Sequence, residues 1–312
     1  MNELNKIQNI IKLRAEYIAK LHLLPYDGSP EIKENKSGKY IYIRKRVLGK
    51  LTSKYVDKYS EELYQLLLKN SKEARELKKQ IRNCDKELAM LGYSFNELSP
   101  QVVKNIDFAR INMKINIYNQ AILEGVATTF PQTETIIDNG IVSNMKASDV
   151  QKILNLKHAW EFILETNVIQ SKTDLNLLSY IAKIVNEGFY ENGGIIRSVP
   201  VLIGGSNYVP GIPLEAVIKN DITSIINQDL NNIDKAIELC LYCMKKRIFN
   251  DGNKRAAVIF ANHYLISNGN GMLVINEKYV SKFKKLLVSY YENNNNNKIK
   301  EFIKSKCVIE LR

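Results

Sequence analysis

The sequence is poor in the residues that build disulfide and metal sites. It has four cysteines, Cys84, Cys240, Cys243 and Cys307, and only three histidines in 312 residues. Cysteines so thinly spread over a large chain predict reduced thiols rather than a disulfide framework. Cys240 and Cys243 form a C-x-x-C pair, but no second pair accompanies them, so zinc is not expected there. We interpret the pair as two half-buried thiols one turn apart on a helix.

Long apolar runs are also missing. No stretch approaches the roughly 18–20 apolar residues that a membrane-spanning helix requires. The first ten residues, MNELNKIQNI, lack the apolar core of a signal peptide. We therefore expect a cytoplasmic protein without membrane contact. Its net charge is +12, and the first 100 residues hold 20 Lys and Arg against 13 Asp and Glu. Such an excess favours a polyanionic partner.

Apolar periodicity and turn residues divide the chain into two parts. Residues 1–100 predict a helix up to Leu24, a basic β-hairpin with strands over 40–47 and 51–56, and a long helix over about 60–91. Residues 101–312 predict a mainly α domain. Its expected helices are 102–124, 147–166, 173–191, 213–228, 231–248, 253–268, 277–291 and 298–307.

One segment of the second part breaks the helical pattern. Residues 193–213 read GGIIRSVPVLIGGSNYVPGIP, an apolar and β-branched run that is interrupted by glycine pairs and prolines. This pattern predicts a β-hairpin with its turn at Gly204, Gly205 and Ser206. Two strands alone make too little sheet for a core. We therefore expect the hairpin to act as a flap over a site.

A second break, RIFNDGNKR, covers residues 247–255. A helix that begins after this turn has unpaired N–H groups and a positive dipole end, which together favour an anion. Gly252 permits close approach of a ligand, and Lys254 and Arg255 add positive charge. Asp251 is a suitable ligand for Mg²⁺ on phosphates. An ordinary joint between two helices, with a capping side chain, remains the alternative.

Three segments together resemble the Fic/Doc (Fido) family. RIFNDGNKR is similar to the family signature His-x-Phe-x-Asp/Glu-Gly-Asn-Gly/Lys-Arg. Residues 193–213 resemble its target-positioning hairpin, and ILEGVATTF at 122–130 resembles its autoinhibitory helix, with the core Ser/Thr-x-x-x-Glu-Gly. The segments occur in the family's order, and the resemblance covers roughly residues 101–312. It implies a Fido helical bundle with a β-hairpin flap, preceded by the α/β-hairpin/α unit of residues 1–100.

The resemblance implies an activity and its cofactors. Fic proteins transfer AMP from Mg²⁺-bound ATP to a Ser, Thr or Tyr hydroxyl of a protein target, and the Doc branch transfers phosphate. Lys254 stands where most of the family has glycine, as in the Doc branch. That branch is associated with toxin–antitoxin systems of bacteria. The sequence leaves open whether the protein forms a homodimer.

The implied roles can be assigned residue by residue. The resemblance places Mg²⁺ on Asp251 and the nucleotide on Gly252, Asn253, Lys254 and Arg255. It makes Glu124 and Gly125 inhibitory. It places an extended target segment, paired by strand addition, along Val201, Leu202, Ile203 and Gly204.

The match has three departures from the family pattern. Arg247 stands at the position of the catalytic histidine, and arginine cannot accept a proton at neutral pH. Val258 replaces a second arginine that normally pairs with the inhibitory glutamate. Gln120 replaces the Ser or Thr four residues before Glu124, and it retains a hydrogen-bond donor. Glu124 is then expected to pair with Arg247 or Arg255. Both an enzyme with altered chemistry and a nucleotide-binding pseudoenzyme remain open.

The basic hairpin of the first part suggests a nucleic-acid partner. Nine Lys and Arg oppose two acids between residues 33 and 58. A two-stranded ribbon of this kind fits a nucleic-acid groove. The candidate contacts are Tyr40, Tyr42, Arg44, Lys45, Arg46 and Lys50. The alternative is a structural sheet with a solvated outer face.

Overall fold

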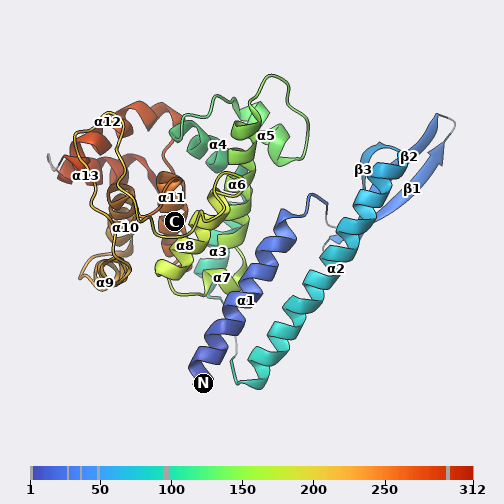
Figure 1. Cartoon of the computed structure of the whole chain (residues 1–312), viewed down its shortest axis with the longest axis horizontal. Helices are drawn as coiled ribbons and strands as arrows, with labels where there is room; N and C mark the ends of the chain where they lie inside the picture. Colours follow the sequence, from blue (N-terminus) through green and yellow to red (C-terminus); the bar gives the residue numbers. More distant parts are fainter. Residues whose placement is uncertain are drawn as a thin grey trace. The chain divides into compact units, whose positions relative to one another are not determined.

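The fold is given by a computed structural model, which describes residues 3–26, 28–35, 37–47, 50–93, 98–292 and 296–311 (Figure 1). The chain divides into two compact units, Met1–Asn96 and Glu97–Arg312; the predicted division falls after residue 100. None of the described helices combines the length and the apolar composition needed to cross a bilayer.

Unit 1 contains two long helices, α1 (Glu3–Leu23) and α2 (Glu61–Met90), which pack against each other. Ile10 of α1 forms a buried cluster with Cys84 and Leu88 of α2. The hydroxyl of Ser60 caps α2 by accepting a hydrogen bond from the Leu63 N–H. The predicted helix–hairpin–helix order is therefore present.

The hairpin of unit 1 is part of a three-stranded antiparallel sheet of order β1 (Ser29–Asn35), β2 (Gly38–Val47) and β3 (Lys50–Lys58). Ile41 and Ile43 of β2 pack against Leu67 of α2. Strand β1 was not predicted. Its sequence, SPEIKEN, has one β-branched residue, so its extended form depends on pairing with β2 rather than on its own propensity.

Unit 2 is a helical bundle, which confirms the predicted mainly α class. Its helices and strands are α3 (Pro100–Ile111), α4 (Met113–Leu123), α5 (Phe130–Ile137), α6 (Ala147–Ile163), α7 (Thr166–Ile169), α8 (Leu175–Val185), α9 (Glu215–Ile226), α10 (Asn232–Lys246), α11 (Asn253–Ser267), β4 (Met272–Leu273), the 3-10 helix η1 (Glu277–Tyr279), α12 (Val280–Tyr291), α13 (Asn296–Lys306) and β5 (Val308–Ile309).

Helix α11 is the centre of unit 2. All its residues except Lys254 and Ser267 are buried, and it contacts α10, α8, α6 and α3 (Figure 1). A helix that is buried on every side must be apolar or internally bonded all round. Its first turn is therefore held in place from several directions, which makes it a rigid support for a site.

Several helix predictions need correction. The helix expected over 102–124 is two helices, α3 and α4, which meet at Asn112 without a glycine or proline to mark the break. Helix α5 was missed, although Thr129 and Gln132 form a capping box at its start. Cys240 and Cys243 lie on α10 as expected but are fully buried, and burial raises the pKa of Cys240 to about 12.

The predicted β-hairpin over 193–213 is wrong. These residues are all described, and the structure gives them no strand. They form an irregular loop with the expected turn, in which the Ser206 N–H donates to the Ile203 carbonyl at 3.1 Å. Pro200, Pro210 and Pro213 cannot donate to a ladder. The guanidinium of Arg197 instead binds loop carbonyls.

Candidate functional site

The RIFNDGNKR segment forms a tight connection between α10 and α11. Arg247 ends α10 in the left-handed region, with φ 49° and ψ 59°, and Gly252 precedes α11 with φ 72°. A β-carbon at residue 252 would lie 2.6 Å from Oδ1 of Asn186, so this position requires glycine. Left-handed backbone is uncommon for a long side chain such as arginine. Such conformations persist where the surroundings enforce them.

Two asparagines hold this loop. Nδ2 of Asn253 donates to the Phe249 carbonyl at 2.7 Å, and its Oδ1 accepts from the Phe249 N–H at 2.9 Å. Nδ2 of Asn186, at the end of α8, donates to the carbonyls of Asp251 and Gly193, both at 3.0 Å. The Asn253 side chain thus closes the loop onto Phe249, and the first N–H groups of α11 have no carbonyl partner within the helix.

Arg255 lies almost wholly buried below the loop, with 1% of its surface exposed. Its guanidinium donates to the Val185 carbonyl at 2.5 Å and to Oδ2 of Asp251 at 3.0 Å. Its Nε lies 3.6 Å from Oε2 of Glu124. A buried charge is tolerated when it has such partners. The loop carboxylate and the buried guanidinium therefore form one unit.

Glu124 caps the end of α4 beside this unit. Its carboxylate lies 3.5 Å from Nζ of Lys254 and 3.6 Å from Nε of Arg255. Of the two arginines expected as partners, the structure pairs it with Arg255. Gly125 follows in the left-handed region with φ 80° and ends the helix. The segment resembling an inhibitory helix therefore does lie against the RIFNDGNKR loop.

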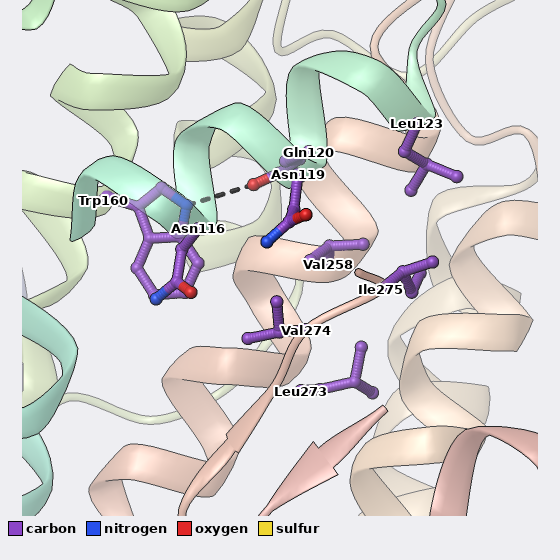
Figure 2. A pocket seen from close by; sticks show the side chains of 9 residues that line it. All are labelled: Asn116, Asn119, Gln120, Leu123, Trp160, Val258, Leu273, Val274 and Ile275. Carbon is purple, nitrogen blue, oxygen red and sulfur yellow. Dashed lines mark hydrogen bonds between the residues drawn. The ribbon is translucent and has the colours of Figure 1, made fainter. Parts of the chain in front are cut away.

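Gln120, one turn before Glu124, fastens α4 to α11. Its Nε2 donates to the Arg255 carbonyl at 2.8 Å, and its Oε1 accepts from Nε1 of Trp160 at 3.0 Å (Figure 2). The expectation that glutamine at this position still donates a hydrogen bond is confirmed. It positions Glu124 through the backbone of α4.

Val258 occupies the place of the family's second arginine. Its side chain lines a cavity of about 10 Å³, enough for about one water molecule. Figure 2 shows that this cavity lies between α4, α11 and the segment 273–275. Position 258 thus contributes an apolar surface toward α4 and no charge to the loop.

Four buried polar atoms around the loop have no hydrogen-bond partner among the described residues. They are Nε of Arg247, Nε of Arg255, Oε1 of Glu124 and Oη of Tyr291. The Arg255 and Glu124 atoms lie within ion-pair distance of Glu124 and Lys254 but make no hydrogen bond. Burial raises the pKa of Tyr291 on α12, and the charge of Arg247 partly opposes this rise. Because nearly all buried polar groups are bonded in folded proteins, this concentration is typical of a site that a polar ligand completes.

Positive charge dominates the surroundings of these atoms. Burial, and then the charge of Lys254, lower the pKa of Lys284 on α12, whereas Glu124 raises it. Lys284 therefore lies close enough to interact electrostatically with both side chains. Four cations face two carboxylates here: Arg247, Lys254, Arg255 and Lys284 against Glu124 and Asp251. The excess favours an anionic ligand.

Arg197 is the most important residue that sequence reasoning missed. It is 2% exposed, and its Nε donates to the Arg247 carbonyl while its terminal nitrogens donate to Val199, Pro210 and Gly211. It ties the loop over 193–214 to the last carbonyls of α10. The sequence did contain a signal for Arg197, because it is a single cation within an apolar, glycine-rich run. Nothing in the sequence marked Asn186, Lys284 or Tyr291.

The predicted flap residues do not share one environment. Leu202 is 85% exposed, whereas Ile203 is buried and Val201 is half-buried. Gly204 is exposed at the turn. The loop is held at the turn by Glu292, which accepts from the Ser206 hydroxyl at 3.1 Å. Only part of the predicted segment is therefore accessible to a partner.

The predicted nucleic-acid residues belong to unit 1. Arg44 is exposed on β2. The side chains of Lys45, Arg46 and Lys50 lie outside what the structure describes.

Comparisons with known proteins agree with this geometry. The Fic/DOC family model matches residues 172–265, which include the RIFNDGNKR loop and most of α11. A second family model, a domain of unknown function (DUF6788), matches residues 4–65. A search of curated proteins found no match.

Solved structures of Fic proteins share the fold. Fic-1 of C. elegans (residues 134–508) is similar with a TM-score of 0.52 and 15% identity, over 77% of this chain and 75% of that one. A Fic domain containing signaling protein from Bacteroides thetaiotaomicron has 0.54 and 20%, over 70% and 90%. A Fic family protein from Desulfovibrio desulfuricans has 0.53 and 13%, over 68% and 73%. Unit 2 thus has the fold of Fic domains. The segment over 172–265 is thus similar to the Fic/DOC family in sequence, and the fold is that of solved Fic proteins.

Proposed function

We propose that the RIFNDGNKR loop binds the phosphates of a nucleotide, with ATP as the expected ligand. The observation that carries the proposal is the set of buried polar atoms without a hydrogen bond, beside four cations, at the start of α11. The free N–H groups of this helix end and its dipole add to the attraction for phosphate. Gly252 has no side chain that would keep a phosphate group away from the backbone.

Asp251 would hold Mg²⁺ at this site. Its side chain is 47% exposed, and its Oδ2 accepts a hydrogen bond from Arg255 at 3.0 Å. A half-exposed carboxylate oriented in this way fits the oxygen ligands that Mg²⁺ prefers. When bound, the ion would neutralise phosphate charge.

We further propose that transfer of AMP to a protein hydroxyl is impaired. Arg247 keeps its proton, so it adds positive charge toward phosphate and removes no proton from a target. Burial raises the pKa of Tyr291, so its phenol stays protonated and cannot accept the proton of a target hydroxyl. His263 is fully buried, with its ring nitrogens bonded to Thr173 and to the Val168 carbonyl. An enzyme of the same fold with another base is the second candidate, and exposed Leu202 would then contact the protein target.

Thermal unfolding with and without millimolar Mg-ATP tests the nucleotide site. A ligand at 100 times its Kd stabilises by about 2.7 kcal/mol, so a clear rise in Tm is expected. Asp251→Ala should abolish the rise, and Asp229→Ala, at an exposed acid elsewhere, should not. A wild-type Tm unchanged by Mg-ATP would contradict the proposal. Labelling of lysate proteins from α-labelled ATP decides between the two candidates.

A further inference from the structure

The three-stranded sheet of unit 1 has two unlike faces. Side chains alternate along a strand, and Ile41 and Ile43 of β2 point into the cluster with Leu67. Tyr40 and Tyr42 therefore belong to the opposite face, and Arg44 follows them in the same alternation. The sheet is covered by α2 on the isoleucine face, and the tyrosine face carries a different set of groups.

Three tyrosines are contiguous on this second face. Tyr55 of β3 pairs directly with Tyr42. Its ring centroid lies 5.6 Å from that of Tyr42 and 6.2 Å from that of Tyr40. Tyr55 is 49% exposed although it is a large aromatic residue. The rings thus form a continuous aromatic surface rather than isolated exposed residues.

Cations border this aromatic surface. Nζ of Lys33 lies over the face of the Tyr42 ring, 4.5 Å from its centroid, and donates to the Ser53 hydroxyl at 3.0 Å. Arg44 is exposed beside Ser53, its pairing partner on β3. The carboxylate of Glu31 lies 3.9 Å from Lys33 and offsets part of its charge. With nine Lys and Arg against two acids over residues 33–58, the surroundings remain strongly basic.

Flat rings bordered by cations match one ligand chemistry well. Bases of a single strand can stack on aromatic side chains while Lys and Arg contact the phosphates. A duplex hides the faces of its bases, so it cannot use such a surface in this way. We propose that the tyrosine face, defined by Tyr40, Tyr42 and Tyr55, binds single-stranded nucleic acid by base stacking. The proposal concerns unit 1 and is independent of the nucleotide site.

Fluorescence anisotropy on the full chain with a labelled 20-nucleotide oligouridylate tests the proposal. Replacing a stacking ring by alanine costs about 1–3 kcal/mol per base, which corresponds to a Kd about 5- to 150-fold higher. Tyr55→Ala and Tyr42→Ala should each show this loss. Tyr55→Phe keeps the ring and should bind like the wild type.

The charged residues provide a second readout. Arg44→Gln should lower the slope of log Kd against log salt concentration by about 0.7, the value for one phosphate contact on a single strand. Lys79→Gln, at an exposed position of α2, is the matched control. It should change the slope less than Arg44→Gln does.

Three results would overturn the inference. One is the absence of binding at 50 mM salt, and another is unchanged affinity in both tyrosine-to-alanine variants that circular dichroism shows to be folded. The third is a 20-base-pair duplex that binds as tightly as the single strand and is insensitive to the alanine variants, since that result would assign the face to backbone contacts.

Discussion

Asn253 offers the sharpest test of how the site is built. The family signature assigns this residue to the nucleotide site, whereas the structure uses its side chain to close the loop onto Phe249. If this is its main role, Asn253→Ala must destabilise the folded protein even when no ligand is present. A residue whose side chain served only the ligand would leave the stability of the free protein unchanged.

The size of the effect follows from two hydrogen bonds. Phe249 is 1% exposed, so its N–H and C=O would both be left buried without these partners. Each buried group that loses its partner costs about 1–3 kcal/mol. Local relaxation recovers part of the loss, so we expect a total of about 2–5 kcal/mol. For a unit of this size, each 1 kcal/mol corresponds to about 2–4 °C in Tm. We therefore expect a Tm lower by about 4–20 °C.

Fluorescence of Trp160 provides the assay, because it is the single tryptophan of the chain and is buried in unit 2. Urea titrations of the wild type and Asn253→Ala would give the free energies of unfolding. Asn250→Ala, at an exposed position of the same loop, is the control and should stay within about 0.5 kcal/mol of the wild type. An Asn253→Ala loss no larger than that of the control would refute the reasoning.

Three further predictions concern the site and the core. Arg247→His should raise labelling of protein by α-labelled ATP about 10²–10⁴-fold, because it supplies a general base; labelling equal to that of the wild type would argue against an intact scaffold. Glu124→Gln should tighten Mg-ATP binding in calorimetry, since Lys254 and Arg255 lose a competing carboxylate, and weaker binding would be inconsistent with that competition. Burial lowers the pKa of His263 from 6.5 to about 4, so the unfolded chain takes up this proton first as the pH falls. Stability should therefore drop by about 3 kcal/mol between pH 7 and pH 4, and His263→Gln should flatten that slope; parallel slopes in urea titrations would contradict the assignment.

Much of the fold could be predicted because its signals are local. Apolar spacing located most of the helices of unit 2, and the turn before α11 was evident from Asp251 and Gly252 alone. The errors also have local causes. Strand β1 has weak propensity and exists through its pairing with β2, and the loop over 193–213 has strand-like composition but prolines and Arg197 prevent a ladder.

The candidate site was predicted only in part. Residues within the RIFNDGNKR segment were found because the family signature is contiguous. Asn186, Lys284 and Tyr291 come from other helices, and each is an ordinary residue in its own segment. Their importance arises from where α8 and α12 place them, and neighbouring residues carry no information about that placement.

The sequence by itself determined a helical domain, a basic β unit before it, and a turn with glycine, asparagine and cations at the start of a helix. It also determined that Arg247 replaces the expected base. Only the tertiary structure decided that Glu124 pairs with Lys254 and Arg255, that Asn253 closes the loop, and that four buried polar atoms of the described residues around it lack a hydrogen bond. The reason is physical: helix and turn formation depend on residues a few positions apart, whereas ion pairs and unsatisfied groups depend on packing between distant segments.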